Sequence, residues 1–247
     1  MRAIILAAGS GSRLRDSAPG LPKCLLRLGG KTLLQRHLEI LHGCGVSEIV
    51  LVLGFARESI ETELDTLGLR LRPLTLDNPR YQEGSVVSLW TARHQLLRGG
   101  EVLVMDADVL YGRHLIERLF GSRFANCFLL DRDFIPGEEP VKLCVRGGHL
   151  VEFRKRIPQN LEFDFCGESV GFFRFSESVA KQLAQICEQY VNDGRTLEPH
   201  EEAIRDLLLN SAPGTFGFEE ITGSPWTEID FPDDLRRAEE VILPRLS

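Results

Sequence analysis

The feature that most constrains the fold is an alternation of apolar runs with amphipathic helical patterns through the first half of the chain. Continuous apolar runs are typical of strands that are covered on both faces, and the intervening patterns are typical of helices that bury one face. The expected strands are residues 3–7, 48–53, 69–76 and 101–105, and the expected helices are residues 32–44, 57–67, 85–97 and 112–120. This rhythm predicts a parallel sheet whose functional loops gather at the carboxyl ends of the strands.

After about residue 125 the strand-like runs follow one another without helices between them, which predicts a partly antiparallel extension of the sheet. Strands are expected at residues 127–130, 141–145, 150–153, 168–175 and 215–219, and helices at residues 176–190, 201–209 and 232–243. The sequence therefore predicts one α/β domain over residues 1–247, with a Rossmann-like, mixed but mostly parallel sheet flanked by helices. Residues 126–247 are expected to form a substrate-binding half.

Charge and cysteine content narrow the classes of function. The net charge of −7 and a pI near 5.5 give the whole chain no electrostatic footprint for nucleic acid or an anionic membrane. No apolar stretch approaches the ~20 residues of a membrane span. The six cysteines are scattered without a C-x-x-C pair, which indicates reduced thiols and a cytoplasmic protein.

A glycine-rich loop, LAAGSGSRL, directly follows the first apolar run. Such a turn presents successive backbone N–H groups to an anion such as phosphate. A dinucleotide fold would require a third glycine where Leu14 stands and an acidic residue after the second strand, where the chain has Gly54. A Walker A loop would require Gly-Lys-Ser/Thr, which is absent, and a glycine turn without a ligand is the remaining alternative. Arg13 and Lys23 instead bring two cations to the loop, which favours a triphosphate.

Two aspartates, Asp106 and Asp108, follow the strand VLVM in the pattern D-x-D. Carboxylates at the cleft edge of a sheet are suited to Mg²⁺, whose other ligands would be phosphate oxygens and water. Strand-ending aspartates also cap helices, so a capping role is the alternative. Asp230, which precedes a helix begun by proline, is on its own a helix cap.

The motif LAAGxGxRL…PK resembles the nucleotide-binding loop of the sugar-phosphate nucleotidyltransferase superfamily, whose members join a nucleoside triphosphate to a phosphorylated substrate and release pyrophosphate. The segments NPRYQEGSVVSLWTAR, DADVLY, GESVGFFRFS, EEAIRDLL and WTEIDFPDDLRRA are most similar to the phosphocholine and 2-aminoethylphosphonate cytidylyltransferase family. The resemblance runs in order over nearly the whole chain. It implies CTP as donor, a nucleotide-binding half over residues 1–125, and a metal held by Asp108 and Asp230.

The resemblance also implies roles for other residues. Arg13 and Lys23 are expected to act on the phosphates of CTP, and Lys155 on the acceptor's phosphate, although Arg154, Arg156 and Lys142 are rivals for that role. The nucleotide is expected to contact Leu6, Ala7, Ala8, Gly9, Gly11, Ser12, Gln82, Gly84, Ser85, Ser88 and Asp106. The family often carries asparagines where this chain has residues 84–86, so recognition of the base or substrate differs in detail here.

The acceptor pocket is less constrained by the sequence. Aromatic side chains would favour a quaternary ammonium and carboxylates a primary ammonium. The favoured candidates are Glu168, Glu201 and Trp226, and the others are Asp133, Tyr81, Trp90, Tyr111 and Phe172. Trp226 is expected on a loop. The segment GESVG matches the nucleophile elbow of α/β-hydrolases, but an apolar strand-like run follows Ser169 where that motif needs a helix.

The sequence therefore predicts a Mg²⁺-dependent cytidylyltransferase acting on phosphocholine or 2-aminoethylphosphonate, without nucleic-acid binding or membrane insertion and compatible with a homodimer. A sugar 1-phosphate enzyme using another nucleoside triphosphate is one alternative. A regulatory domain that binds a nucleotide without catalysis is another, although a sensor has no need of the metal pair.

Overall fold

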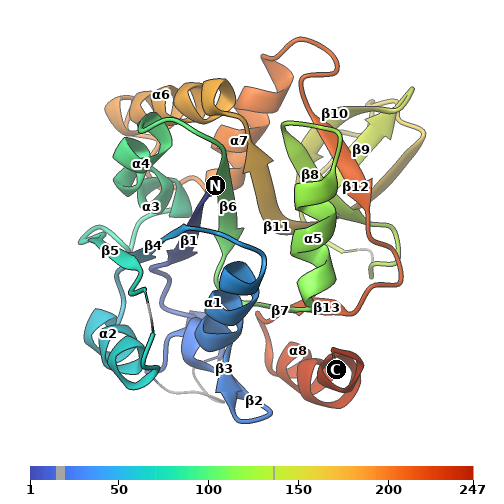
Figure 1. The fold of residues 1–247 in the computed structure, drawn as a ribbon. Coiled ribbons are helices and arrows are strands. Elements are labelled where there is room, and N and C mark those ends of the chain that lie inside the picture. Colours follow the sequence, from blue (N-terminus) through green and yellow to red (C-terminus); the bar gives the residue numbers. More distant parts are fainter. Residues whose placement is uncertain (15–19, 70, 136, 247) are drawn as a thin grey trace.

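A central mixed sheet organises the molecule, which the computed structural model describes at residues 1–14, 20–69, 71–135 and 137–246 (Figure 1). Its strands are β1 (Arg2–Ala7), β4 (Glu48–Leu53), β5 (Leu74–Asp77), β6 (Val102–Asp106), β8 (Cys127–Asp131), β9 (Lys142–Arg146), β10 (His149–Arg154), β11 (Phe165–Phe175) and β12 (Gly217–Glu220). The order is β10-β9-β11-β6-β1-β4-β5, and β8 joins β11 to β12. Strands β6, β1, β4 and β5 run parallel, whereas β11 is antiparallel to β6, β8 and β9. The predicted mixed sheet flanked by helices is confirmed.

Helices cover both faces of the sheet. One face is covered by α1 (Leu33–Gly43), α2 (Arg57–Thr66) and α5 (Arg113–Gly121), and the other by α3 (Ser85–Thr91), α4 (Arg93–Leu97), α6 (Glu177–Asn192) and α7 (His200–Leu209). Alternation along β1 sends Ile5 into the first core and Ile4 into the second, as a strand covered on both faces requires. In the described part of the chain, no helix has the length and apolar character needed to cross a bilayer.

Three predicted elements differ in extent from the structure. The strand expected at residues 69–76 is confined to Leu74–Asp77, because Pro73 has no N–H to donate to a ladder, and residue 70 lies outside the described residues. The helix expected at residues 85–97 breaks at Ala92, whose ψ of 3° leaves the helical range. The last helix is α8 (Pro232–Arg237), followed by a wider π turn at Ala238–Ile242 and a 3₁₀ turn at Leu243–Arg245.

Two short strand pairs are absent from the sequence-based prediction. Strand β7 (Val109–Tyr111) pairs antiparallel with β13 (Trp226–Glu228), and β2 (Arg27–Leu28) pairs with β3 (Lys31–Thr32). Trp226 therefore lies on a strand and not on the expected loop. The pairing of β7 with β13 brings residues near the end of the chain against the segment that follows β6 (Figure 1).

Candidate functional site

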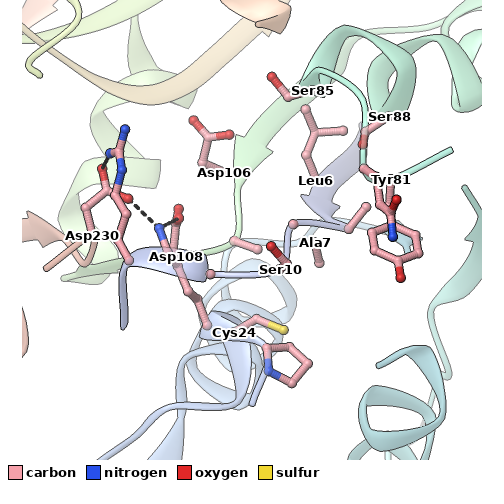
Figure 2. Close-up of a pocket in the computed structure, with 18 of the residues that line it drawn as sticks. Leu6, Ala7, Ser10, Cys24, Tyr81, Ser85, Ser88, Asp106, Asp108 and Asp230 are labelled. Atoms are coloured by element: carbon pink, nitrogen blue, oxygen red, sulfur yellow. Dashed lines mark hydrogen bonds and ion pairs between the residues drawn. The ribbon is translucent and has the colours of Figure 1, made fainter. Parts of the chain in front are cut away.

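The carboxyl ends of β1 and β6 open into a cavity of about 450 Å³, at the edge of the sheet where the sequence predicts function (Figure 2). Of the predicted site residues, its lining includes Leu6, Ala7, Ala8, Gly9, Gly11, Arg13, Lys23, Gln82, Ser85, Ser88, Asp106, Asp108 and Asp230. The lining also contains Tyr81, an aromatic candidate for the acceptor, and residues to which the sequence analysis assigned no individual role: Ser10, Pro22, Cys24, Glu83 and Ala107. Residues 15–19 and the side chain of Ser12 lie outside what the structure describes.

The loop after β1 folds against the side chain of Lys23. Gly11 has a φ of +57°, a left-handed conformation that favours glycine, and its carbonyl accepts a hydrogen bond from the Leu14 N–H at 3.0 Å. A Cβ on Gly11 would lie 3.0 Å from Cγ of Lys23, so glycine lets the lysine stem pass close to the loop. Lys23 itself begins a short 3₁₀ turn, Lys23–Leu25. The loop conformation thus directs one cation into the cavity.

The ammonium of Lys23 lies between two carboxylates, those of Asp108 and Asp230, which Figure 2 labels at one side of the cavity. Its Nζ donates to Oδ2 of Asp108 at 2.8 Å and to Oδ1 of Asp230. Burial alone would lower the pKa of Lys23, but the two carboxylates outweigh burial and raise it above its ordinary value. Nη1 of Arg13 lies 3.4 Å from Oδ2 of Asp230. The predicted cations and metal ligands therefore meet at one point of the cavity.

Glu228 adds a third carboxylate that the sequence analysis missed. Oxygens of Asp108, Glu228 and Asp230 all lie within 4.8 Å of one another, and a set of carboxylate oxygens fits a hard divalent cation such as Mg²⁺. Although part of its side chain is exposed in the cleft, burial and then the charges of Asp108 and Asp230 raise the pKa of Glu228. The E-x-D spacing was the available signal, because residues two apart on an extended segment share a face.

The pairing of β7 with β13 brings the three carboxylates together. Glu228 lies opposite Val109, directly after Asp108, and the Ile229 N–H donates to the Asp108 carbonyl at 3.0 Å. The side chain of Ile229 is fully buried with Leu110 in a small apolar cluster beneath the site. Residues about 120 positions apart in the chain are thus fixed side by side by backbone hydrogen bonds and packing.

Asp106 is separate from this carboxylate group. It lies at the end of β6, and a Cβ on Gly171 of β11 would overlap its carboxylate; Gly171 also has a φ of +80°. Burial, then the charges of Glu201 and Asp108, raises the pKa of Asp106 well above its ordinary value. Asp106 therefore lines the cavity without belonging to the three-carboxylate cluster.

The QEGSVVS segment contributes unevenly to the cavity. Ser88 lines it and accepts a hydrogen bond from the Asn78 amide at 3.0 Å. Gly84 lies against residues 197–198, and a Cβ there would overlap the Glu198 carbonyl. The structure thus gives Gly84 a packing contact in place of the predicted position on the cavity wall.

A second cavity of about 160 Å³ adjoins the first and shares Asp230 with it. Glu168 and Trp226, both predicted to contact the acceptor, line this cavity, and the Trp226 indole N–H donates to Oδ2 of Asp131 at 2.7 Å. Burial, reinforced by the charge of Asp131, raises the pKa of Glu168 to about 7. The acidic residues of the lining are Asp131, Asp133, Glu139, Glu168, Glu228, Asp230 and Asp234, with Arg237 as the cation among the described lining residues.

Lys155 and Glu201 line a third cavity of about 360 Å³, which adjoins the first at Arg13. Nζ of Lys155 and Nη1 of Arg13 both lie 3.1 Å from Oε2 of Glu139. Lys142, an alternative candidate for contacting the acceptor's phosphate, is buried. Its ammonium donates to the backbone carbonyls of residues 137, 140 and 155. The structure thus places Lys155 close to Arg13. Lys155 itself lines neither the first nor the second cavity.

A glycine loop, paired cations and a carboxylate cluster at the strand ends of a mixed α/β sheet suit a class of proteins that transfer phosphoryl or nucleotidyl groups. The chain belongs to the family of the MobA-like NTP transferase domain, which it matches over residues 3–146. The predicted nucleotidyltransferase superfamily is therefore confirmed.

Curated relatives match nearly the whole chain. The chain is 30% identical over 245 residues to the bifunctional IPC transferase and DIPP synthase of Rubrobacter xylanophilus, covering 98% of this chain and 52% of the relative. It is 25% identical to the choline-phosphate cytidylyltransferase of Streptococcus pneumoniae, with 98% of each chain covered. The chain spans about half the length of the bifunctional relatives that it matches.

Solved structures share the fold. The inositol-1-phosphate CTP transferase of T. maritima superposes with a TM-score of 0.76 at 22% identity, covering 94% of this chain and 90% of the other. This likeness agrees with the single α/β fold described above.

Proposed function

We propose that the chain is a Mg²⁺-dependent cytidylyltransferase that transfers CMP from CTP to a small phosphorylated or phosphonylated alcohol carrying a cationic nitrogen. Phosphocholine and 2-aminoethylphosphonate are the favoured acceptors, and pyrophosphate is the second product. The observation that carries the proposal is the carboxylate cluster with Lys23 at the junction of a nucleotide-sized cavity and a smaller acidic cavity.

On the donor side, the loop after β1 would bind phosphate oxygens through backbone N–H groups, with Arg13 and Lys23 neutralising charge. An anionic oxygen of the acceptor forms a bond to the α-phosphorus of CTP, and the bond from that phosphorus to the β-phosphate oxygen breaks. No general base is required, because a phosphate or phosphonate oxygen is already ionised at neutral pH. Bound to Asp108, Glu228 and Asp230, Mg²⁺ would supply positive charge to the phosphate oxygens.

On the acceptor side, the charge of the second cavity supports a cationic substrate tail. Glu168 and Asp131 lie near each other, and their proximity contributes to the raised pKa of Glu168. A bound ammonium would relieve this repulsion, whereas a neutral polyol would leave it in place. Trp226 and Phe231 add aromatic surface to the same lining. The pneumococcal relative is a choline-phosphate cytidylyltransferase, which supports both the nucleotide and the acceptor.

The test is a pyrophosphate-release screen that crosses ATP, CTP, GTP and UTP with phosphocholine, 2-aminoethylphosphonate, inositol 1-phosphate and glucose 1-phosphate. We expect turnover with CTP and a nitrogen-containing acceptor, lost in excess EDTA and restored by Mg²⁺. Turnover with glucose 1-phosphate and a nucleotide other than CTP would contradict the proposal. Turnover with CTP and inositol 1-phosphate alone would contradict the cationic acceptor and leave the cytidylyl transfer standing.

A further inference from the structure

His200 lies next to Ser85 and Asp106, two residues that line the first cavity, but it does not line that cavity itself. It is the first residue of α7, and its side chain is only 3% exposed. His200 has no role in the proposed transfer reaction. Its two ring nitrogens nevertheless face Ser85 at the beginning of α3 and Asp106 at the end of β6, and both of these residues line the cavity.

The first contact fixes the Ser85 hydroxyl. The backbone N–H of His200 donates to Oγ of Ser85 at 2.8 Å, and the same Oγ lies 3.0 Å from Nδ1 of the ring. Because Oγ already accepts the backbone hydrogen bond, its own hydrogen is available to Nδ1. In the tautomer with the ring hydrogen on Nε2, Nδ1 accepts this hydrogen. Oε2 of Glu201 also lies 3.0 Å from Nδ1 and would accept a hydrogen from it in the other tautomer.

The second contact concerns Asp106. Nε2 of His200 is buried and has no hydrogen-bond partner among the residues that the structure describes. Oδ1 of Asp106 lies 3.7 Å away, slightly beyond a hydrogen bond. Gly171 borders the same carboxyl group on β11. When the ring hydrogen is on Nε2, it is a buried donor without a partner among the described residues, so a small rotation of Asp106 toward Nε2 would be stabilising.

The surroundings of His200 hold the ring in place. The Gly84 N–H donates to the Thr196 carbonyl at 2.8 Å, and the Val86 N–H donates to the Glu198 carbonyl at 3.2 Å. The imidazole also packs edge-on against Phe173, with ring centroids 6.1 Å apart. Backbone hydrogen bonds therefore join the segment before α7 to the beginning of α3, and the ring lies between α3 and the end of β6.

We propose that His200 is a positioning residue of the nucleotide site, which holds the Ser85 hydroxyl through Nδ1 and orients the Asp106 carboxyl through Nε2 when the nucleotide binds. The identity of that nucleotide as CTP rests on the proposed function. The position of the His200 ring between Ser85 and Asp106 rests on contacts within this chain.

Three variants separate the two contacts. The amide of His200→Asn reaches the position of Nδ1, the amide of His200→Gln reaches that of Nε2, and His200→Phe provides neither. We expect His200→Phe to raise the KM for CTP about tenfold, in line with loss of hydrogen bonding to a charged group, and to leave the KM for the acceptor unchanged. Each amide variant is expected to lie between wild type and His200→Phe. His94→Asn, on an exposed position of α4, is the matched control and should match wild type.

A merely structural role predicts a lower melting temperature and a smaller folded fraction, without a selective change in the KM for CTP. The inference would be overturned by KM values for CTP within about twofold of wild type in all three variants. Equal increases in the KM for CTP and in the KM for the acceptor would also overturn it. If His200→Phe fails to fold, the two amide variants carry the test. If CTP gives no turnover but another nucleoside triphosphate raises the melting temperature of wild type, the proposed function fails and the variants are compared by binding of that nucleotide. Binding of none of the four would overturn both.

Discussion

At the scale of single residues, Lys23 brings a positive charge to the point where Asp108 and Asp230 meet. Lys23→Met should lower kcat/KM for CTP by about 10²–10³, because a fixed charge aimed at the phosphates is lost. Steady-state kinetics with the best acceptor would measure the loss. Lys31→Met, which removes an exposed lysine paired with Glu39, is the matched control. Native turnover by Lys23→Met would show that its role is misassigned.

The same substitution has a consequence for the metal. Without the ammonium, the carboxylates of Asp108, Glu228 and Asp230 would repel one another at distances below 4.8 Å. Added Mg²⁺ should therefore raise the melting temperature of Lys23→Met more than that of wild type. Thermal unfolding with and without Mg²⁺ tests this, with Ca²⁺ as a second oxygen-preferring cation. Equal shifts in the two proteins would argue against a metal at these carboxylates.

Glu168 is expected to make folding stability depend on pH. Its pKa is raised to about 7 in the folded state, mainly by burial, so between its ordinary value of 4.5 and 7 the folded protein retains a proton that the unfolded chain has lost. Stability should therefore fall as pH rises through this window, by about 1–3 kcal/mol. Glu168→Gln should remove that fall, as measured by urea unfolding at pH 4.5 to 8. The exposed Glu239→Gln should behave as wild type, and parallel pH profiles for wild type and Glu168→Gln would refute the assignment.

At the scale of elements, the pairing of β7 with β13 brings Asp108 to Asp230, and Ile229 lies between two of the three carboxylates. Ile229→Ala should lower the free energy of unfolding by about 2–4 kcal/mol. It should also weaken Mg²⁺ binding, because the void left by the missing side chain lies next to the carboxylates. Ile242→Ala empties a site in the same apolar cluster and should cost a similar amount of stability. Urea unfolding and Mg²⁺ titration measure the two effects. Equal metal affinity in both variants would mean that the pairing does not position the ligands.

The sequence predicts an element well when the pattern that identifies it lies within the element's own residues. The strand at β4 and the helix at α1 follow from continuous apolar runs and helical periodicity, and both are confirmed. Strands β7 and β13 each span three residues, too few for a pattern, and form only because they pair across the fold. Glu228 was missed for the same reason. The second cavity was anticipated through Glu168, Trp226 and Asp133 but not through Asp131, which reaches Trp226 only by tertiary contact.

At the scale of the whole molecule, the proposed function requires an acidic chain to bind two anionic substrates. The net charge of −7 opposes this, so local cations have to provide the attraction. Arg13, Lys23 and Lys155 gather where the three cavities adjoin, each paired with Glu139 or an aspartate. The proposed substrates would therefore bind at a shared boundary, where they would compete with acidic side chains for these cations.

This shared boundary predicts that the two substrates bind with positive coupling. Asp230 lines the first and second cavities, and Arg13 contacts both Asp230 and Glu139, so a nucleotide that engages Arg13 also rearranges the acceptor side. A non-hydrolysable CTP analogue with Mg²⁺ should tighten acceptor binding by about 5- to 100-fold, as titration calorimetry would measure. Arg13→Gln should reduce this factor, whereas Arg236→Gln, which changes an exposed arginine of α8, should preserve it. Equal acceptor affinity with and without the analogue would mean that the cavities act independently.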